Sequence, residues 1–223
     1  AMLIEQVYEQ RIRVQNAELK QLQYQINPHF LYNSIFIIYR MAKMGDIDGI
    51  LGLSRHLGNY YQFVTKSASD EVLFSREWEH AKDYIQIQTI RYLNKIHVEF
   101  DEPSDEFKKL SVPRLVLQPM IENVFNHGLK SKLKDGLLRI RFMESSDCFS
   151  VLVEDNGNEM NDEILKNMKE SLESNDDKVE NTGLLNVHRR LRIKFGEDSG
   201  IYLSINELGG LSVEMRITSR RDV

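Results

Sequence analysis

A histidine directly after a proline is the strongest chemical signal in the chain. It lies in residues 25–34, which read QINPHFLYNS. An imidazole titrates near neutrality and can act as a nucleophile, while a proline before it frees backbone groups and bends a helix. His29 is therefore a candidate acceptor of a transferred group, although a lone helical histidine is more often a packing or surface residue. Asn33 follows four residues later, on the same helix face.

A second segment, residues 118–128, reads QPMIENVFNHG and has helical character. Glu122 and Asn123 are adjacent polar residues among Ile, Met, Val and Phe. Burying them is costly unless they meet a ligand or a hydrogen-bond partner. An amide oxygen suits Mg²⁺, which prefers hard oxygen ligands.

Two further segments contain glycines at points where a chain can approach a ligand closely. Residues 151–157, VLVEDNG, form an apolar strand that ends in a turn, and residues 182–191, TGLLNVHRRL, place a glycine at the start of a helix. Such a helix N-terminus favours phosphate. By itself, the Asp-Asn-Gly sequence is only a turn signal.

Taken in this order, the four segments resemble the phosphoacceptor box, the N box and the two glycine boxes of LytS/YesM-type sensor histidine kinases. The phosphoacceptor box of that family reads close to Q-x-N-P-H-F-L-x-N. The resemblance implies that His29 receives the γ-phosphoryl group of ATP and passes it to an aspartate of a response regulator. It also implies that Asn33 orients a water for dephosphorylation, with a helix-surface amide as the alternative.

The same resemblance implies an ATP-binding domain of the Bergerat type, with ATP and Mg²⁺ bound together. Asn123 is then the magnesium ligand, and Asp155 accepts a hydrogen bond from the adenine amino group. Glu122 is either the base for His29 or an orienter of the waters of the metal. The remaining implied nucleotide contacts are Gly157, Gly183, Leu184, Asn126 and His127.

The chain departs from the family pattern at three positions. Asn126 stands where a lysine is common, and Glu159 and Asn181 stand where glycines are usual. Each change removes a phosphate-facing cation or a flexible backbone position. A degenerate, weakly nucleotide-binding dimeric signalling scaffold is therefore the alternative function. An anti-sigma-type serine kinase is disfavoured, because those proteins lack a long helical hairpin with Asn-Pro-His.

Residues 1–66 must position His29, and their pattern predicts a helical hairpin. Ile12, Leu19 and Ile26 repeat every seven residues, and apolar residues continue past Pro28 to Gly45. A second apolar stripe runs through residues 50–64. A hairpin covers little of its own apolar surface, so we expect a homodimer in which two copies form a four-helix bundle.

The rest of the chain is expected to bind the nucleotide. Residues 67–94 are predicted to form a helical connector, with Ser75 as its N-cap. Residues 95–223 are predicted to form an α/β sandwich: strands near 96–100, 137–142, 149–153, 201–205 and 211–217, and helices near 113–129, 161–172 and 184–195. The predicted fold class is α+β multidomain.

Bulk composition excludes some classes of function. The 29 Lys and Arg against 34 Asp and Glu give a net charge of -5, which argues against nucleic acid as a partner. The single cysteine excludes an intramolecular disulfide framework. No apolar run reaches the length of a membrane span. We expect a location at the cytoplasmic face of the cell membrane, with attachment through a segment absent from this chain.

Overall fold

The computed structural model describes residues 28–65, 70–93, 95–130, 132, 135–158, 160–173 and 183–218. The chain divides into two compact units, Ala1–Ala68 and Ser69–Val223. The predicted heptad helix before Pro28 lies outside the described residues, as do Glu159 and Asn181.

The first unit contains helices α2 (Pro28–Met44) and α3 (Ile47–Thr65). Between them Gly45 adopts a φ of 71°, which glycine tolerates without steric cost. The Asp46 carboxylate accepts a hydrogen bond from the N–H of Gly49 at 2.9 Å and so caps α3. The rings of Phe30 and Tyr60 pack 4.8 Å apart and join the two helices. The turn and the second helix are thus where the sequence predicts them.

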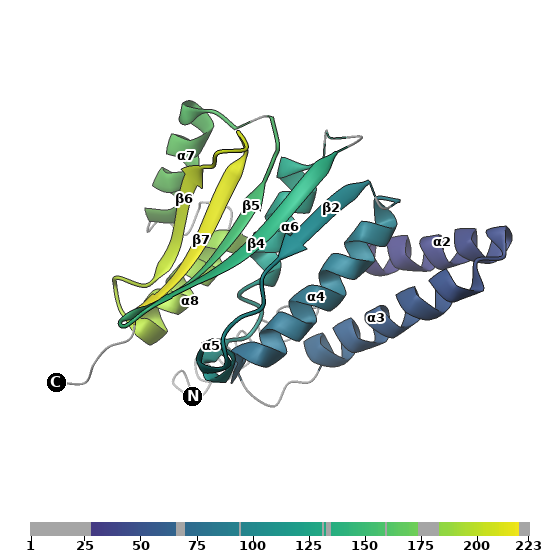
Figure 1. The fold of residues 1–223 in the computed structure, drawn as a ribbon, viewed down its shortest axis with the longest axis horizontal. Helices are drawn as coiled ribbons and strands as arrows, with labels where there is room; N and C mark the ends of the chain where they lie inside the picture. Colours follow the sequence, from purple (N-terminus) through teal and green to yellow (C-terminus); the bar gives the residue numbers. More distant parts are fainter. Residues whose placement is uncertain are drawn as a thin grey trace, which may run out of the picture. The chain divides into compact units, whose positions relative to one another are not determined.

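The second unit is built on a mixed five-stranded sheet (Figure 1). Its strand order is β2-β4-β5-β7-β6; β2 pairs with β4 in parallel, and the other pairs are antiparallel. The strands are β2 (Ile96–Phe100), β4 (Gly136–Ser145), β5 (Cys148–Asp155), β6 (Gly200–Ile205) and β7 (Leu211–Thr218). The helices are α4 (Phe74–Arg91), α5 (Asp105–Lys109), α6 (Gln118–Asn123), α7 (Asp162–Glu173) and α8 (Gly183–Phe195). A small antiparallel pair, β1 (Glu71–Leu73) and β3 (Ser111–Pro113), stands apart from this sheet.

The two faces of the five-stranded sheet differ in chemistry, as alternation along a strand requires. One face contributes buried apolar side chains to the core, which are Leu138, Ile140, Val151, Val153, Val213 and Met215. The other face carries charged pairs. Arg139 bonds to Glu99 at 3.0 Å, and Arg141 bonds to Glu154 at 2.8 Å. The predicted α/β sandwich is therefore observed, with its core on one side of the sheet.

Helix α4, within the predicted connector, packs into the core of the second unit. Trp78 is almost fully buried and meets Phe142 of β4 edge-on at 5.1 Å. Phe74 lies 4.5 Å from Phe107 of α5. The predicted cap at Ser75 is wrong, because the helix begins at Phe74 and its N-cap, Leu73, makes no side-chain cap bond.

The predicted helix over 113–129 is shorter and less regular than expected. Residues 114–117 form a turn in which Leu115 has a φ of 58°, so α6 begins only at Gln118. A π-helical turn, η1 (Val124–Gly128), then follows α6 directly. Periodicity in the sequence does not predict the turn, because the turn depends on hydrogen bonds to Glu77 of α4. Within the described ranges no helix is both long and apolar enough to cross a membrane.

Candidate functional site

His29 and Asn33 lie one turn apart near the start of α2. The Asn33 Nδ2 atom is 3.1 Å from the His29 Nε2 atom; His29 is exposed and Asn33 is half-buried. The next turn of the helix is anchored by Phe30, which packs on Tyr60, and by Ser34, whose hydroxyl donates to the Phe30 carbonyl at 2.8 Å. An exposed imidazole with an amide beside it is therefore held on a packed helix, as the spacing predicts.

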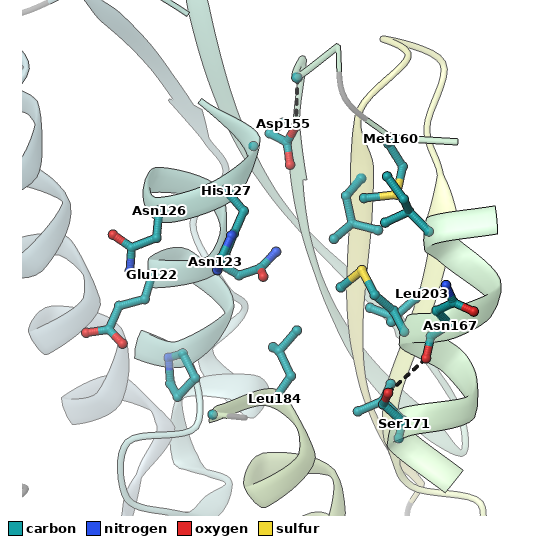
Figure 2. A pocket seen from close by; sticks show the side chains of 18 residues that line it. Glu122, Asn123, Asn126, His127, Asp155, Met160, Asn167, Ser171, Leu184 and Leu203 are labelled. Atoms are coloured by element: carbon teal, nitrogen blue, oxygen red, sulfur yellow. Dashed lines mark hydrogen bonds between the residues drawn. The ribbon is translucent and has the colours of Figure 1, made fainter. Parts of the chain in front are cut away.

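A cavity of about 670 Å³ lies in the second unit between α6–η1 and α7 (Figure 2). It contains all but two of the predicted site residues, and those two are His29 and Asn33 of the first unit. Its lining residues from the N box and the two glycine boxes are Glu122, Asn123, Asn126, His127, Asp155, Gly157, Gly183 and Leu184. The N box and both glycine boxes therefore meet at one place.

The two sides of the α6–η1 helix have different roles in this cavity. Figure 2 shows the Asn123 amide turned toward the cavity, with His127 beside it. Glu122 and Asn126 extend from the other side of the helix. The π-helical turn begins directly after Asn123, and such turns are frequent at functional sites.

Asp155, at the end of β5, is the most constrained polar group of the cavity. It is 1% exposed, and its Oδ1 atom accepts a hydrogen bond from the N–H of Gly157 at 2.7 Å. Its Oδ2 atom has no hydrogen-bond partner among the described residues. Burial raises the pKa of the Asp155 carboxyl, against the hydrogen bond from Gly157. A buried acceptor of this kind is available to a donor from a ligand.

Three glycines surround this carboxylate closely. A Cβ atom on Gly128 would lie 2.5 Å from the Asp155 carboxylate. Cβ atoms on Gly157 and Gly210 would also collide with Asp155. Gly157 was a predicted site residue, whereas the packing roles of Gly128 and Gly210 follow only from the fold.

Asn206 is a site-supporting residue that sequence reasoning missed. Its side-chain Nδ2 donates to the Asp155 carbonyl at 2.8 Å, and its Oδ1 accepts from the N–H of Leu208 at 2.9 Å and from that of Gly210 at 3.1 Å. The β6–β7 turn is thereby fixed against the end of β5. The available signal was an asparagine in a Gly-Gly turn, which by itself indicates only turn chemistry.

The rest of the cavity is largely apolar. Helix α7 turns Ile164, Met168 and Leu172 toward it, at spacings that place them on one helix face. At the start of α8, a Cβ atom on Gly183 would lie 3.0 Å from Pro119, so α8 packs closely on α6. Apolar walls with a few directed polar groups are typical of small-molecule and cofactor sites.

A buried carboxylate of α4 holds the turn before α6. Glu77 is 0% exposed and accepts hydrogen bonds from the N–H groups of Leu115 at 3.0 Å and Leu117 at 3.1 Å. Burial raises the pKa of Glu77 to about 7, although these amides and the nearby Arg190 oppose the shift. Arg190 of α8 also donates to the Arg114 carbonyl at 2.7 Å.

A chain of hydrogen bonds links α4 to Glu122. His80 Nε2 lies 2.9 Å from Gln118 Oε1, and Gln118 Nε2 donates to Glu122 Oε1 at 2.8 Å. Tyr84 of α4 bonds to Glu122 as well. Burial raises the pKa of Glu122, while the bonds from Gln118 and Tyr84 lower it. Glu122 is thus held between two elements.

The cavity residues fit an adenine nucleotide with magnesium. The unpartnered Asp155 Oδ2 atom can accept a hydrogen bond from an exocyclic amino group, and the apolar α7 wall can cover a ring face. Within the described ranges no cluster of three or more His, Cys, Asp and Glu side chains could hold a metal ion. A magnesium ion here would therefore need phosphate oxygens and waters beside the Asn123 amide oxygen.

Comparison with known proteins agrees with the resemblance carried by the sequence motifs. The sequence profile of the family described as Histidine kinase matches residues 17–96. The sensor histidine kinase YesM of Bacillus subtilis is 30% identical over 221 residues, which is 99% of this chain and 37% of that protein. The sensor protein LytS of Oceanobacillus iheyensis is 28% identical over 200 residues, 89% of this chain and 34% of that protein. The chain thus spans about a third of the length of these relatives.

Among solved structures, the catalytic domain of the histidine kinase ThkA is 12% identical, with a TM-score of 0.49, and covers 67% of this chain and 96% of that one. Because this TM-score is low, the assignment rests on the sequence relatives. With the boxes in family order from His29 to Leu184, these matches support a histidine kinase of the LytS/YesM type.

Proposed function

We propose that this chain is the autophosphorylating part of a sensor histidine kinase in a two-component system. The γ-phosphoryl group of ATP is transferred to a ring nitrogen of His29 and then to an aspartate of a response regulator. The observation that carries the proposal is the buried Asp155 Oδ2 atom, which lacks a partner among the described residues and lines an apolar cavity. It is the acceptor that an adenine amino group requires.

In the nucleotide complex, Asp155 would recognise adenine and the α7 wall would cover the ring. The Asn123 amide oxygen would hold magnesium, which supplies charge neutralisation around the phosphates. The N-terminus of α8, with Gly183 and Leu184, favours phosphate. His127, beside Asn123, would contact the phosphates in place of the lysine that is common in this family.

The transfer step breaks the bond between the γ-phosphorus and the bridging oxygen and forms a bond from that phosphorus to a His29 ring nitrogen. ADP leaves with the electrons of the broken bond. The ring proton of His29 passes to a base, and Glu122 is our candidate for that role or for orienting the waters of the metal. Positioning and charge neutralisation supply most of the rate, as in other phosphoryl transfers.

Asn33 would act in the opposite reaction, the removal of phosphate from the response regulator. Its amide nitrogen is 3.1 Å from His29 Nε2, so it can hold a water in the volume where a phosphoaspartate would meet the histidine. We assign it to dephosphorylation of the response regulator.

The chain would act as a homodimer through residues 1–66. Four large apolar side chains of α2 are exposed at spacings of three and four residues, which places them on one face. They are Tyr32, Ile35, Phe36 and Tyr39. On α3, Ile47 and Leu51 are also exposed apolar side chains. Such a stripe in a soluble helix pair is best covered by a second copy.

The setting of the whole protein follows from its family. We place it at the cytoplasmic face of the cell membrane, attached through a segment outside this chain. A response regulator is the expected protein partner. The net charge of -5 gives no support for binding nucleic acid.

A weakly nucleotide-binding scaffold is the second candidate, and one observation favours it. No lysine or arginine is among the described residues that line the cavity. A titration with ATP and Mg²⁺ by calorimetry separates the two functions. Measurable binding is expected for the kinase, and absence of binding at millimolar ATP would leave the scaffold.

Labelling with radioactive ATP tests the phosphoacceptor directly. The wild-type chain should incorporate acid-labile phosphate, and His29→Gln should abolish the incorporation while leaving ATP binding intact. His97→Gln is the control, because His97 is an exposed histidine on β2. Label that persists in His29→Gln or resists acid would indicate a hydroxyl acceptor and refute the proposal.

A further inference from the structure

Helix α4 is joined to the N box segment by a ladder of polar contacts along one of its faces. Glu77 binds the amides before α6, His80 meets Gln118, and Tyr84 meets Glu122. The positions 77, 80 and 84 are three and four residues apart and so share a helix face. The ladder therefore follows α6 along its length and ends at Glu122, which lines the proposed nucleotide cavity.

The contact between His80 and Gln118 has a defined direction. Gln118 Oε1 can only accept a hydrogen bond, so His80 Nε2 must carry the proton. Burial lowers the pKa of His80 to about 4, which keeps the ring neutral at neutral pH. The Gln118 amide is thereby locked with its oxygen toward His80 and its nitrogen toward Glu122, where it donates at 2.8 Å.

The orientation of Gln118 decides what Glu122 meets. If the amide flipped, its oxygen would face the Glu122 carboxylate and the hydrogen bond would become a repulsion. Tyr84 gives Glu122 its second contact from the α4 side, and Gln88 Nε2 in turn bonds to the Tyr84 hydroxyl at 2.5 Å. Both contacts hold the carboxylate in one place.

Packing alone does not account for this arrangement. His80 is 2% exposed, and an apolar side chain at such a position would avoid the cost of burying a polar ring. The chain of hydrogen bonds that begins at His80 Nε2 offsets part of this cost and ends at Glu122, which lines the cavity. We propose that His80 and Gln118 are positioning residues that fix the Glu122 carboxylate for phosphoryl transfer, an inference that rests on the function proposed above.

The test separates positioning from folding by measuring rate and affinity independently. The variants are His80→Leu and Gln118→Met, which remove the hydrogen bond between positions 80 and 118, and His80→Gln, whose amide can still donate to Gln118. At saturating ATP and Mg²⁺ we expect the first two to lower the initial rate of acid-labile labelling about tenfold. This is less than the roughly 100-fold or more that loss of a general base costs, because Glu122 itself is still present. The ATP dissociation constant should stay within about twofold, and His80→Gln should restore most of the rate.

His97→Leu is the matched control, since it makes the same replacement at an exposed site on β2. A rate for His80→Leu and Gln118→Met equal to that of the control would overturn the inference. So would a loss of ATP affinity as large as the loss of rate, because that result indicates general damage to the fold.

A double-mutant cycle with Glu122→Gln tests the route. If His80 acts through Glu122, His80→Leu should cause no further loss in the Glu122→Gln background. A full additional loss there refutes the inference while leaving the role of Glu122 in place. An unchanged rate for Glu122→Gln alone refutes both, and absence of label at His29 in the wild type refutes the kinase function itself.

Discussion

Gly128 faces the Asp155 carboxylate so closely that a Cβ atom on the glycine would lie 2.5 Å from it. Gly128 ends the π-helical turn, in which the N–H of Leu129 bonds to the Val124 carbonyl at 2.8 Å. The end of the N box is thereby fitted against the first glycine box. The cavity depends on this close approach, which only a residue without a side chain permits.

Replacing Asp155 by Asn should weaken ATP binding about tenfold or more, because loss of a hydrogen bond to a buried charged acceptor costs about 1.5–3 kcal/mol. Calorimetry with Mg²⁺ present measures it. Glu154→Gln is the matched control: it removes the same charge one residue away, on the side of β5 where Glu154 meets Arg141. Equal ATP affinities of the two variants would show that Asp155 does not contact the nucleotide.

Asn126→Lys should strengthen ATP binding, by up to about tenfold if the new ammonium reaches a phosphate. The control is Ser145→Lys, which adds the same charge at the last residue of β4. Leu138, which pairs with Asp155, lies near the opposite end of that strand. Figure 2 shows Asn126 on the side of the helix away from Asn123. If both variants bind ATP equally well, position 126 does not face the phosphates.

Phe36→Glu should convert the expected dimer into a monomer, because it places a charge in the exposed apolar stripe of α2. Light scattering at tens of micromolar protein gives the mass. Met143→Glu replaces a comparably exposed apolar residue in the second unit and should leave the mass unchanged. A wild-type chain that is already monomeric at this concentration contradicts the prediction.

Glu77 should make stability fall as the pH rises toward neutrality. Its pKa is about 7 in the folded chain against an ordinary value of 4.5, so between these pH values the folded state binds the proton more tightly than the unfolded state. The contribution of the protonated form is complete below pH 4.5 and is lost as the pH rises through about 7. Glu77→Gln cannot ionise and should escape this loss.

The melting temperature of Glu77→Gln, measured relative to wild type, should therefore increase from about pH 5 to about pH 8. Glu79→Gln, at an exposed position on the same helix, should show no such trend. A difference between Glu77→Gln and wild type that is constant over this range would mean that Glu77 is ionised throughout.

Local sequence patterns predict most of the helices and strands and the order of the boxes. Alternation and helical periodicity are local properties, so the strands at 96–100 and 201–205 and helices α7 and α8 lie close to their predicted positions. The spacing from His29 to Asn33 also fixed their proximity, because four residues make about one helical turn. Local geometry was sufficient in each of these cases.

The tertiary structure alone decided how the N box is supported. Helix α6 starts at Gln118 rather than near Pro113 because Glu77, 40 residues away along the chain, binds the amide of Leu117. No local pattern in the sequence encodes that hydrogen bond. The same holds for the His80–Gln118 contact, which spans 38 residues. Long-range hydrogen bonds between buried polar groups thus determine where α6 begins and how Glu122 is held, because a buried polar group must find its partner wherever the fold places it.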